Sequence, residues 1–255
     1  MRFLVALVLA VSTTWAHCEP SVLFYNSQTH HSLIAERADE VRPIASITKL
    51  MTALVALDTG FALDRSVKLN NRWGSVLPVK PYTRRELLTA TLVKSDNSAA
   101  ETLAEDFPGG RTEFLREMNE RARRLGMLNT HFDDASGLIA TNVSTIRDLQ
   151  ILLAESLKYP LIRELTTTQR AEILVPGKKR AVKVVVNNTN SPLLGNFASS
   201  TVLGKTGLTS RAGWCVAMVL EEQGQQFSVI VLGAKTKAER TKIVERIVHV
   251  NLRSN

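Results

Sequence analysis

The sequence predicts an α+β fold (an α/β sandwich). In it, an antiparallel sheet built from both chain ends is flanked by helices and lies beside a central helical cluster. Two observations predict it. Apolar runs typical of strands occur at 21–35 and again between 181 and 232. Apolar residues at helical spacing dominate the stretch between them, from 46 to 156. A cleft where the sheet meets the helices is the natural place for a binding site.

The first segment is an export signal rather than part of this fold. Arg2 supplies a positive charge, 3–11 form an apolar run, and Thr14-Trp15-Ala16 provides a small-residue cleavage signal. We therefore expect residues 1–16 to be a signal peptide cut after Ala16, since the apolar run is too short to span a bilayer. His17 stands where a lipoprotein signal has Gly or Ala, so lipidation of Cys18 is not expected.

The mature chain, 17–255, is expected to be a single domain, because it has no Pro/Gly/Ser-rich linker, repeat or low-complexity block. Loss of the signal lowers the formal charge from +8 to +7. The basic residues are scattered without interleaved aromatic residues, so no nucleic-acid partner is expected. No later stretch is apolar enough for a transmembrane anchor. Cys215 lies in an apolar strand and is expected to be buried rather than disulfide-bonded.

The first half of the chain begins with strands and continues with helices. Val22-Leu23-Phe24-Tyr25 and Leu33-Ile34-Ala35 predict the two strands of a hairpin. An apolar helix is predicted from Ser46 to Leu57, where apolar residues recur at helical spacing. Helical patterns continue at 85–93, 98–105, 112–125 and 144–156.

The second half returns to strands. One strand is predicted at 181–186, and a hairpin joins 214–220 to 227–232 across Gln223-Gly224-Gln225. A helix at 238–252 closes the chain, with apolar residues on one face. We expect this helix to pack on the sheet rather than to anchor the protein in a membrane.

Three short motifs follow one another in the chain: Ser46-Ile47-Thr48-Lys49, Ser95-Asp96-Asn97 and Lys205-Thr206-Gly207. Ser-x-x-Lys, Ser-x-Asn and Lys-Thr-Gly form the set used by serine acyl-transfer enzymes that act on D-alanyl peptides and β-lactams. Each motif is weak alone, but all three in this order arise by chance in about one chain in a hundred.

The first motif supplies a nucleophile and a base. Lys49 lies one helical turn after Ser46 on the same face. A serine hydroxyl needs a base, and a lysine serves as one when burial or a second cation, here Lys205, lowers its pKa. Taken alone, the pattern is more typical of an N-cap serine followed by a solvated lysine.

The other two motifs supply the relay and the substrate contacts. Ser95 lies on a turn or loop and would relay a proton toward the leaving group, while Asn97 would bond the substrate amide. Lys205 and Thr206 would hold a substrate carboxylate, and Gly207 would let the substrate backbone approach the strand. The alternatives are an ordinary helix cap for Ser95-Asp96-Asn97 and a strand-entry turn for Lys205-Thr206-Gly207.

The chain resembles the D-alanyl-D-alanine peptidase family of low-molecular-mass penicillin-binding proteins. Within it, the chain is most similar to the D-alanyl-D-alanine endopeptidase type represented by penicillin-binding protein 7. The stretches that carry the resemblance are 41–53, 107–110, 125–132, 136–138, 144–149, 159–162, 205–209 and 212–215.

The resemblance implies a penicillin-binding transpeptidase or β-lactamase-like fold and an acyl-Ser46 intermediate. It implies a backbone oxyanion hole at Ser46 and Leu208, no metal and no organic cofactor. The implied partners are peptidoglycan stem peptides as substrates and β-lactam antibiotics as covalent inhibitors. The implied location is the periplasm.

Several alternatives remain open at this point. A D-alanyl-D-alanine carboxypeptidase shares the motifs, but such enzymes commonly carry a second β-rich domain and an amphipathic anchor, whereas this chain ends about twenty residues after its last predicted strand. A class A β-lactamase needs a Glu-x-x-Asn arrangement, which 132–145 lacks. A His-dependent hydrolase has only His131 with Asp133 as a local pair. A non-catalytic module that binds wall peptide or β-lactam usually loses a motif residue, and none is lost here.

Overall fold

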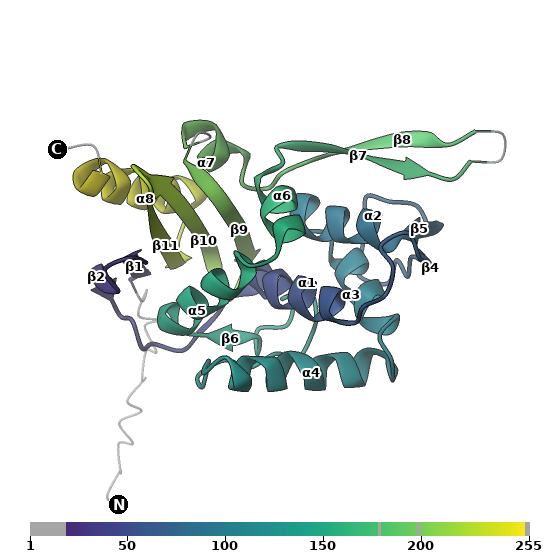
Figure 1. Cartoon of the computed structure of the whole chain (residues 1–255), viewed down its shortest axis with the longest axis horizontal. Coiled ribbons are helices and arrows are strands. Elements are labelled where there is room, and N and C mark those ends of the chain that lie inside the picture. Colours follow the sequence, from purple (N-terminus) through teal and green to yellow (C-terminus); the bar gives the residue numbers. More distant parts are fainter. Residues whose placement is uncertain (1–18, 178–179, 198–199, 253–255) are drawn as a thin grey trace, which may run out of the picture.

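The computed structural model describes residues 19–177, 180–197 and 200–252. A five-stranded antiparallel sheet has the order β2-β1-β11-β10-β9 (Figure 1). Its strands are β1 Ser21–Asn26, β2 His31–Glu36, β9 Thr201–Thr209, β10 Gly213–Glu222 and β11 Gln225–Ala234. Because β1 pairs with β11 along its whole length, the predicted sheet built from both chain ends is confirmed.

The two faces of the sheet carry separate apolar layers. Val22 and Phe24 of β1 point to one layer, which includes α8 (Lys237–Leu252) and α7 (Ser191–Asn196). Leu23, between them, belongs to the larger layer that joins the sheet to the helical cluster. This alternation follows from the two-residue period of a strand. The predicted closing helix therefore packs on the sheet, as expected.

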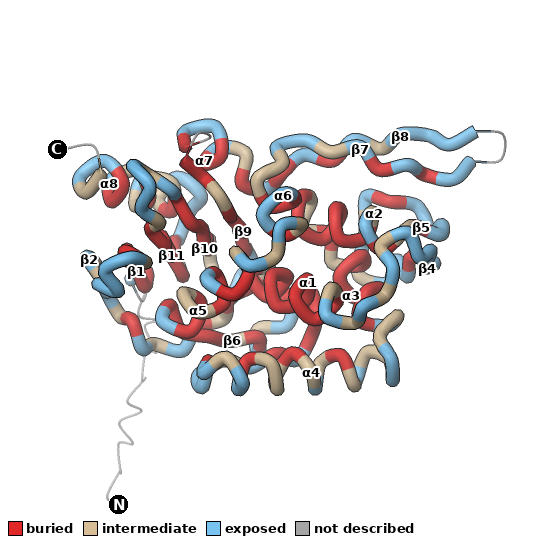
Figure 2. Tube along the Cα trace, in the orientation of Figure 1, coloured by how far each residue is buried: buried red, intermediate tan, exposed pale blue. Residues whose placement is uncertain are grey.

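The helical cluster surrounds α1, which is the most deeply buried helix in Figure 2. All residues of α1 from Lys49 to Ala56 are buried, because α3, α4 and α5 pack around it. The helices of the cluster are α1 Lys49–Asp58, α2 Arg84–Thr89, α3 Asn97–Glu105, α4 Gly110–Arg124, α5 Ile146–Ser156 and α6 Pro160–Thr167.

The predicted helices exist, but two of them change type along their length. The helix predicted from Ser46 begins as a 3₁₀ turn, η1 (Ala45–Thr48), and becomes α-helical at Lys49. The helix predicted at 85–93 becomes a π-turn, η2 (Ala90–Lys94), after α2. A 3₁₀ turn at the start of an α-helix is common, whereas π-turns are frequent at functional sites.

Some elements were missed by the sequence analysis. Helix α6 has only eight residues, and α7 has six, so their apolar periods are too short to detect. Strand β7 (Arg170–Val175) pairs with β8 (Val182–Asn187) in a two-stranded arm beside the cluster (Figure 1). The short strands are β3 Arg42–Pro43, β4 Ser66–Lys68, β5 Pro81–Thr83 and β6 Val143–Ser144.

The hairpin between β10 and β11 turns on two residues rather than the predicted three. Gln223 and Gly224 both have positive φ angles, 50° and 74°, and Gln225 is already the first residue of β11. Two consecutive positive φ angles are typical of the tight turn whose twist matches the strands.

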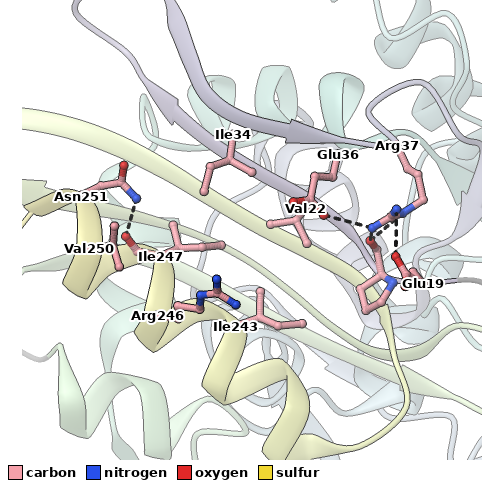
Figure 3. Close-up of a pocket in the computed structure, with 11 residues that line it drawn as sticks. Glu19, Val22, Ile34, Glu36, Arg37, Ile243, Arg246, Ile247, Val250 and Asn251 are labelled. Atoms are coloured by element: carbon pink, nitrogen blue, oxygen red, sulfur yellow. Dashed lines mark hydrogen bonds and ion pairs between the residues drawn. The ribbon is translucent and has the colours of Figure 1, made fainter.

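The far edge of the sheet carries a groove of about 370 Å³ between β1, β2 and α8 (Figure 3). Val22, Ile34 and Ile247 give it an apolar floor, and Arg37 and Arg246 also line it. This groove lies at the β2 edge, whereas the three sequence motifs lie toward β9.

The predicted signal peptide 1–16 and Cys18 lie outside the described residues. Cys215 is buried and carries a free thiol, as expected. Within the described ranges, no helix is both long enough and apolar enough to cross a membrane.

Candidate active site

The three motifs, far apart in the sequence, meet where η1, the end of η2 and the edge strand β9 come together. A cavity of about 290 Å³ opens there. It is lined by Ser46, Ser95, Asn97, Thr189, Thr206, Gly207, Leu208, Trp214 and Arg240. Six of these nine were predicted as site residues; Lys49 and Lys205, also predicted, lie directly behind the lining.

Ser46 lies in the 3₁₀ turn η1, between two close backbone approaches. A Cβ on Gly207 would come 2.8 Å from the Ile44 carbonyl oxygen and 3.1 Å from the Ser46 nitrogen. A Cβ on Gly137 would come 1.9 Å from the carbonyl oxygen of Ala45 and 2.9 Å from the same nitrogen. The structure therefore requires Gly207 for packing against η1, which is a different reason from the predicted approach of a substrate backbone.

Lys49, the first residue of α1, is completely buried and donates three hydrogen bonds. Its Nζ lies 2.9 Å from Ser46 Oγ, 2.8 Å from Asn97 Oδ1 and 2.5 Å from the carbonyl oxygen of Ser136. Burial lowers the pKa of Lys49 to about 7, although nearby carboxylates act in the opposite direction. The alternative of a solvated lysine is therefore wrong, and a lysine of this pKa can take a proton from Ser46 near neutral pH.

Ser95 follows the π-turn η2 and has a left-handed backbone, with φ 61°. The next residue, Asp96, caps α3 by accepting a hydrogen bond from Ala99 N. Asn97 begins α3, and its Oδ1 accepts from Lys49, which leaves its Nδ2 as a donor for a substrate carbonyl. The motif thus caps a helix and also presents two side chains to the cavity.

Lys205 lies inside β9, so Lys205-Thr206-Gly207 is not the strand-entry turn considered above. Its Nζ donates to Ser95 Oγ at 2.9 Å, and only 1% of the residue is exposed. Burial, followed by repulsion from Lys49, holds the pKa of Lys205 well below its ordinary value. Lys205 therefore contacts Ser95 directly, whereas it does not line the cavity in which a ligand would bind.

Thr206 and Thr189 form a pair of hydroxyl groups in the cavity wall, with 2.7 Å between their oxygens. Thr189 comes from the segment between β8 and α7, where its backbone N donates to the carbonyl of Val93. A threonine in an irregular segment has no sequence signal, so Thr189 was missed.

Arg240 was also missed, because an arginine on an amphipathic helix is usually a surface residue. Here only 1% of it is exposed, its guanidinium lies 5.8 Å from the Trp214 ring centroid, and Nη1 lies 3.5 Å from the Cys215 carbonyl oxygen. Its Nε and Nη2 have no hydrogen-bond partner in the described part of the protein. Buried donors without partners beside a cavity favour an anionic ligand there.

No acidic residue lines the cavity among the residues that the structure describes. The pair of His131 and Asp133, 2.9 Å apart, is exposed and does not line the cavity either. Within the same described ranges, no cluster of three His, Cys, Asp or Glu side chains could hold a metal ion.

Comparisons with known proteins show what the whole chain is similar to. A family model described as D-alanyl-D-alanine carboxypeptidase, peptidase S11, matches residues 11–236. The D-alanyl-D-alanine endopeptidases of Pseudomonas aeruginosa and Escherichia coli are each 36% identical over 222 residues, covering 84% of this chain and 71% of theirs. The structure of penicillin-binding protein D2 from Listeria monocytogenes in its ampicillin-bound form has a TM-score of 0.78 at 31% identity, covering 93% of this chain and 98% of that one.

Proposed function

The chain belongs to the D-alanyl-D-alanine carboxypeptidase family, peptidase S11, and we propose that it is a serine D-alanyl-D-alanine endopeptidase that cleaves peptidoglycan cross-links. One observation carries the catalytic part of this proposal. The wholly buried Lys49 lies 2.9 Å from Ser46 Oγ and has a pKa of about 7. A serine with such a neighbour is an activated nucleophile.

In the acylation step, Ser46 Oγ attacks the carbonyl carbon of a D-alanyl residue while Lys49 takes the hydroxyl proton. The carbonyl oxygen becomes negative and is held by the backbone N–H groups of Ser46 and Leu208. A proton passes through Ser95, which Lys205 contacts at 2.9 Å, to the departing amine. The C–N bond breaks and leaves an ester on Ser46, which water then hydrolyses.

Substrate recognition uses the donors around the cavity. Asn97 Nδ2 bonds the peptide carbonyl. The Arg240 guanidinium and the hydroxyl groups of Thr206 and Thr189 hold the free carboxylate of the departing D-amino acid. Arg240 lines the cavity, so its positive charge lies beside the place where this carboxylate would bind. A charge-assisted pair of this kind fixes the substrate in register with Ser46.

β-Lactams are proposed to acylate the same serine, because the strained amide mimics a D-alanyl-D-alanine end. The site of action is proposed to be the periplasm. This rests on the predicted signal peptide and on substrates that belong to the cell wall.

The test is digestion of purified cross-linked wall fragments, followed by mass measurement of the products. Release of monomers from dimers supports the endopeptidase, whereas loss of one terminal D-alanine from monomers supports a carboxypeptidase. Ser46→Ala is expected to lose turnover and penicillin labelling while keeping the wild-type melting temperature. A Ser46→Ala protein that still turned over either substrate would exclude Ser46 as the nucleophile.

A further inference from the structure

The turn formed by residues 133–139 carries one of the three oxygen atoms that accept hydrogen bonds from Lys49. The carbonyl oxygen of Ser136 lies 2.5 Å from Lys49 Nζ. The turn is fixed against α1 by a hydrogen bond from Thr52 Oγ1 to the Ala135 carbonyl at 2.6 Å. Gly137, with φ +78°, packs against the peptide between Ala45 and Ser46. The turn therefore touches both the base and the backbone of the nucleophile.

Asp134 organises this turn from inside. Only 2% of Asp134 is exposed, and it does not line the cavity. Its carboxylate accepts backbone hydrogen bonds from Ser136 at 2.8 Å, from Gly137, and from Ile139 at 2.6 Å. Asn142 Nδ2 adds a fourth contact at 3.2 Å. A buried carboxylate with this many donors is held in one position.

Several charged groups face Lys49, and Asp134 differs from the others. Glu101 on α3 forms a salt bridge with Arg111, whose Nε lies 2.7 Å from Glu101 Oε2. Asp96, before α3, caps that helix and accepts from Ser75 at 2.6 Å. Lys205 on β9 is a cation, and it repels a positive charge on Lys49. Asp134 differs because its carboxylate holds the turn whose Ser136 carbonyl accepts a hydrogen bond from Lys49.

We propose that Asp134 is a positioning residue for acylation. Its carboxylate holds the turn that presents the Ser136 carbonyl to Lys49, and its charge sets the pH range in which Lys49 accepts the proton of Ser46. The inference rests on the proposed function of Ser46 and Lys49.

The sign of the effect follows from electrostatics. A negative charge near an ammonium stabilises the protonated form and raises its pKa, and Asp134 is the largest such influence on Lys49. Without that charge, Lys49 becomes neutral at lower pH. A residue with a purely structural role would instead lower the acylation rate equally at every pH.

The experiment measures the rate of Ser46 acylation by a fluorescent penicillin between pH 5 and pH 9 in the full mature protein. For Asp134→Asn, we expect the midpoint of the acid limb to move down by about one pH unit. The maximal rate should fall about tenfold or more, because the turn loses an acceptor. Asp133→Asn is the matched control, since Asp133 is the adjacent, half-exposed aspartate. It should keep both the midpoint and the rate of the wild type.

Asp134→Glu separates position from charge, because it keeps the charge and displaces the carboxylate. We expect a lower rate at every pH with the wild-type midpoint. A folded Asp134→Asn protein with an unmoved midpoint would overturn the charge role. If Asp134→Asn shows no cooperative melting, a wild-type rate in Asp134→Glu would overturn the positioning role. Failure of the wild type itself to acylate would refute the proposed function, and therefore the inference resting on it.

Discussion

At the scale of residues, Lys49 shows how a buried cation becomes a base. A lysine in water keeps its proton until about pH 10.4. Removal from water disfavours the charged form of Lys49, and the carboxylates of Asp134, Asp96 and Glu101 limit this effect, so its pKa falls to about 7. The lysine therefore exchanges its proton near physiological pH while three oxygens hold its Nζ in place.

The rate of Ser46 acylation should rise with pH through a midpoint near 7, because only neutral Lys49 accepts a proton. Lys49→Arg keeps the positive charge but cannot lose its proton in this range. We expect it to lower acylation by about a thousandfold or more and to remove the acid limb. Stopped-flow acylation by a fluorescent penicillin measures both. A near wild-type rate in a folded Lys49→Arg protein would show that the base lies elsewhere.

Arg240 leads to a prediction about substrate binding. Arg240→Gln removes the positive charge that attracts the substrate carboxylate. We therefore expect kcat/KM to fall about a hundredfold, mostly because KM rises. A substrate with an amide in place of that carboxylate should lose far less. Arg246→Gln is the control, because Arg246 lies on the same helix but lines the groove of Figure 3. Equal losses for both variants would place the carboxylate elsewhere.

At the scale of elements, the site depends on unusual segments at the ends of regular ones. A 3₁₀ turn carries Ser46 into α1, and a π-turn ends at the left-handed Ser95. The turn around Gly137 then packs on the peptide before Ser46. The first motif therefore runs directly into α1, and the second runs directly into α3.

Gly137→Ala tests this packing. The new Cβ would meet the Ala45 carbonyl oxygen at 1.9 Å in a backbone with φ +78°. We expect a loss of about 3 kcal/mol or more of unfolding free energy, and slower acylation in the folded fraction. Gly126→Ala has a similar φ, +83°, with nothing within 4 Å, so it should cost only about 1 kcal/mol. Denaturant unfolding compares the two, and equal costs would contradict the close approach.

At the scale of the whole molecule, the sheet and the helical cluster enclose a cavity whose described lining contains hydroxyl, amide and guanidinium groups but no carboxylate. Asp134, which does not line the cavity, has both carboxylate oxygens occupied by backbone donors. The architecture thus favours acylation of Ser46 over activation of water against a bulky adduct.

The penicilloyl-Ser46 adduct should therefore persist for minutes or longer while wall peptides turn over. The penicilloyl ring hinders the approach of water, and the described lining offers no carboxylate to activate it. Intact-mass measurement after a brief pulse of penicillin should show one stable addition per protein. Rapid return to the unmodified mass, with excess drug consumed, would favour a β-lactamase instead.

The sequence by itself determined the strands near both ends of the chain, the main helices and the three motifs. These features depend on local period and residue type, which a linear pattern records. Only the tertiary structure decided that Lys49 is buried, that Lys205 lies behind Ser95, and that Arg240 and Thr189 enter the cavity. Burial and convergence arise from segments far apart in the chain. For this reason, the same arginine in the same helical pattern could equally have faced solvent.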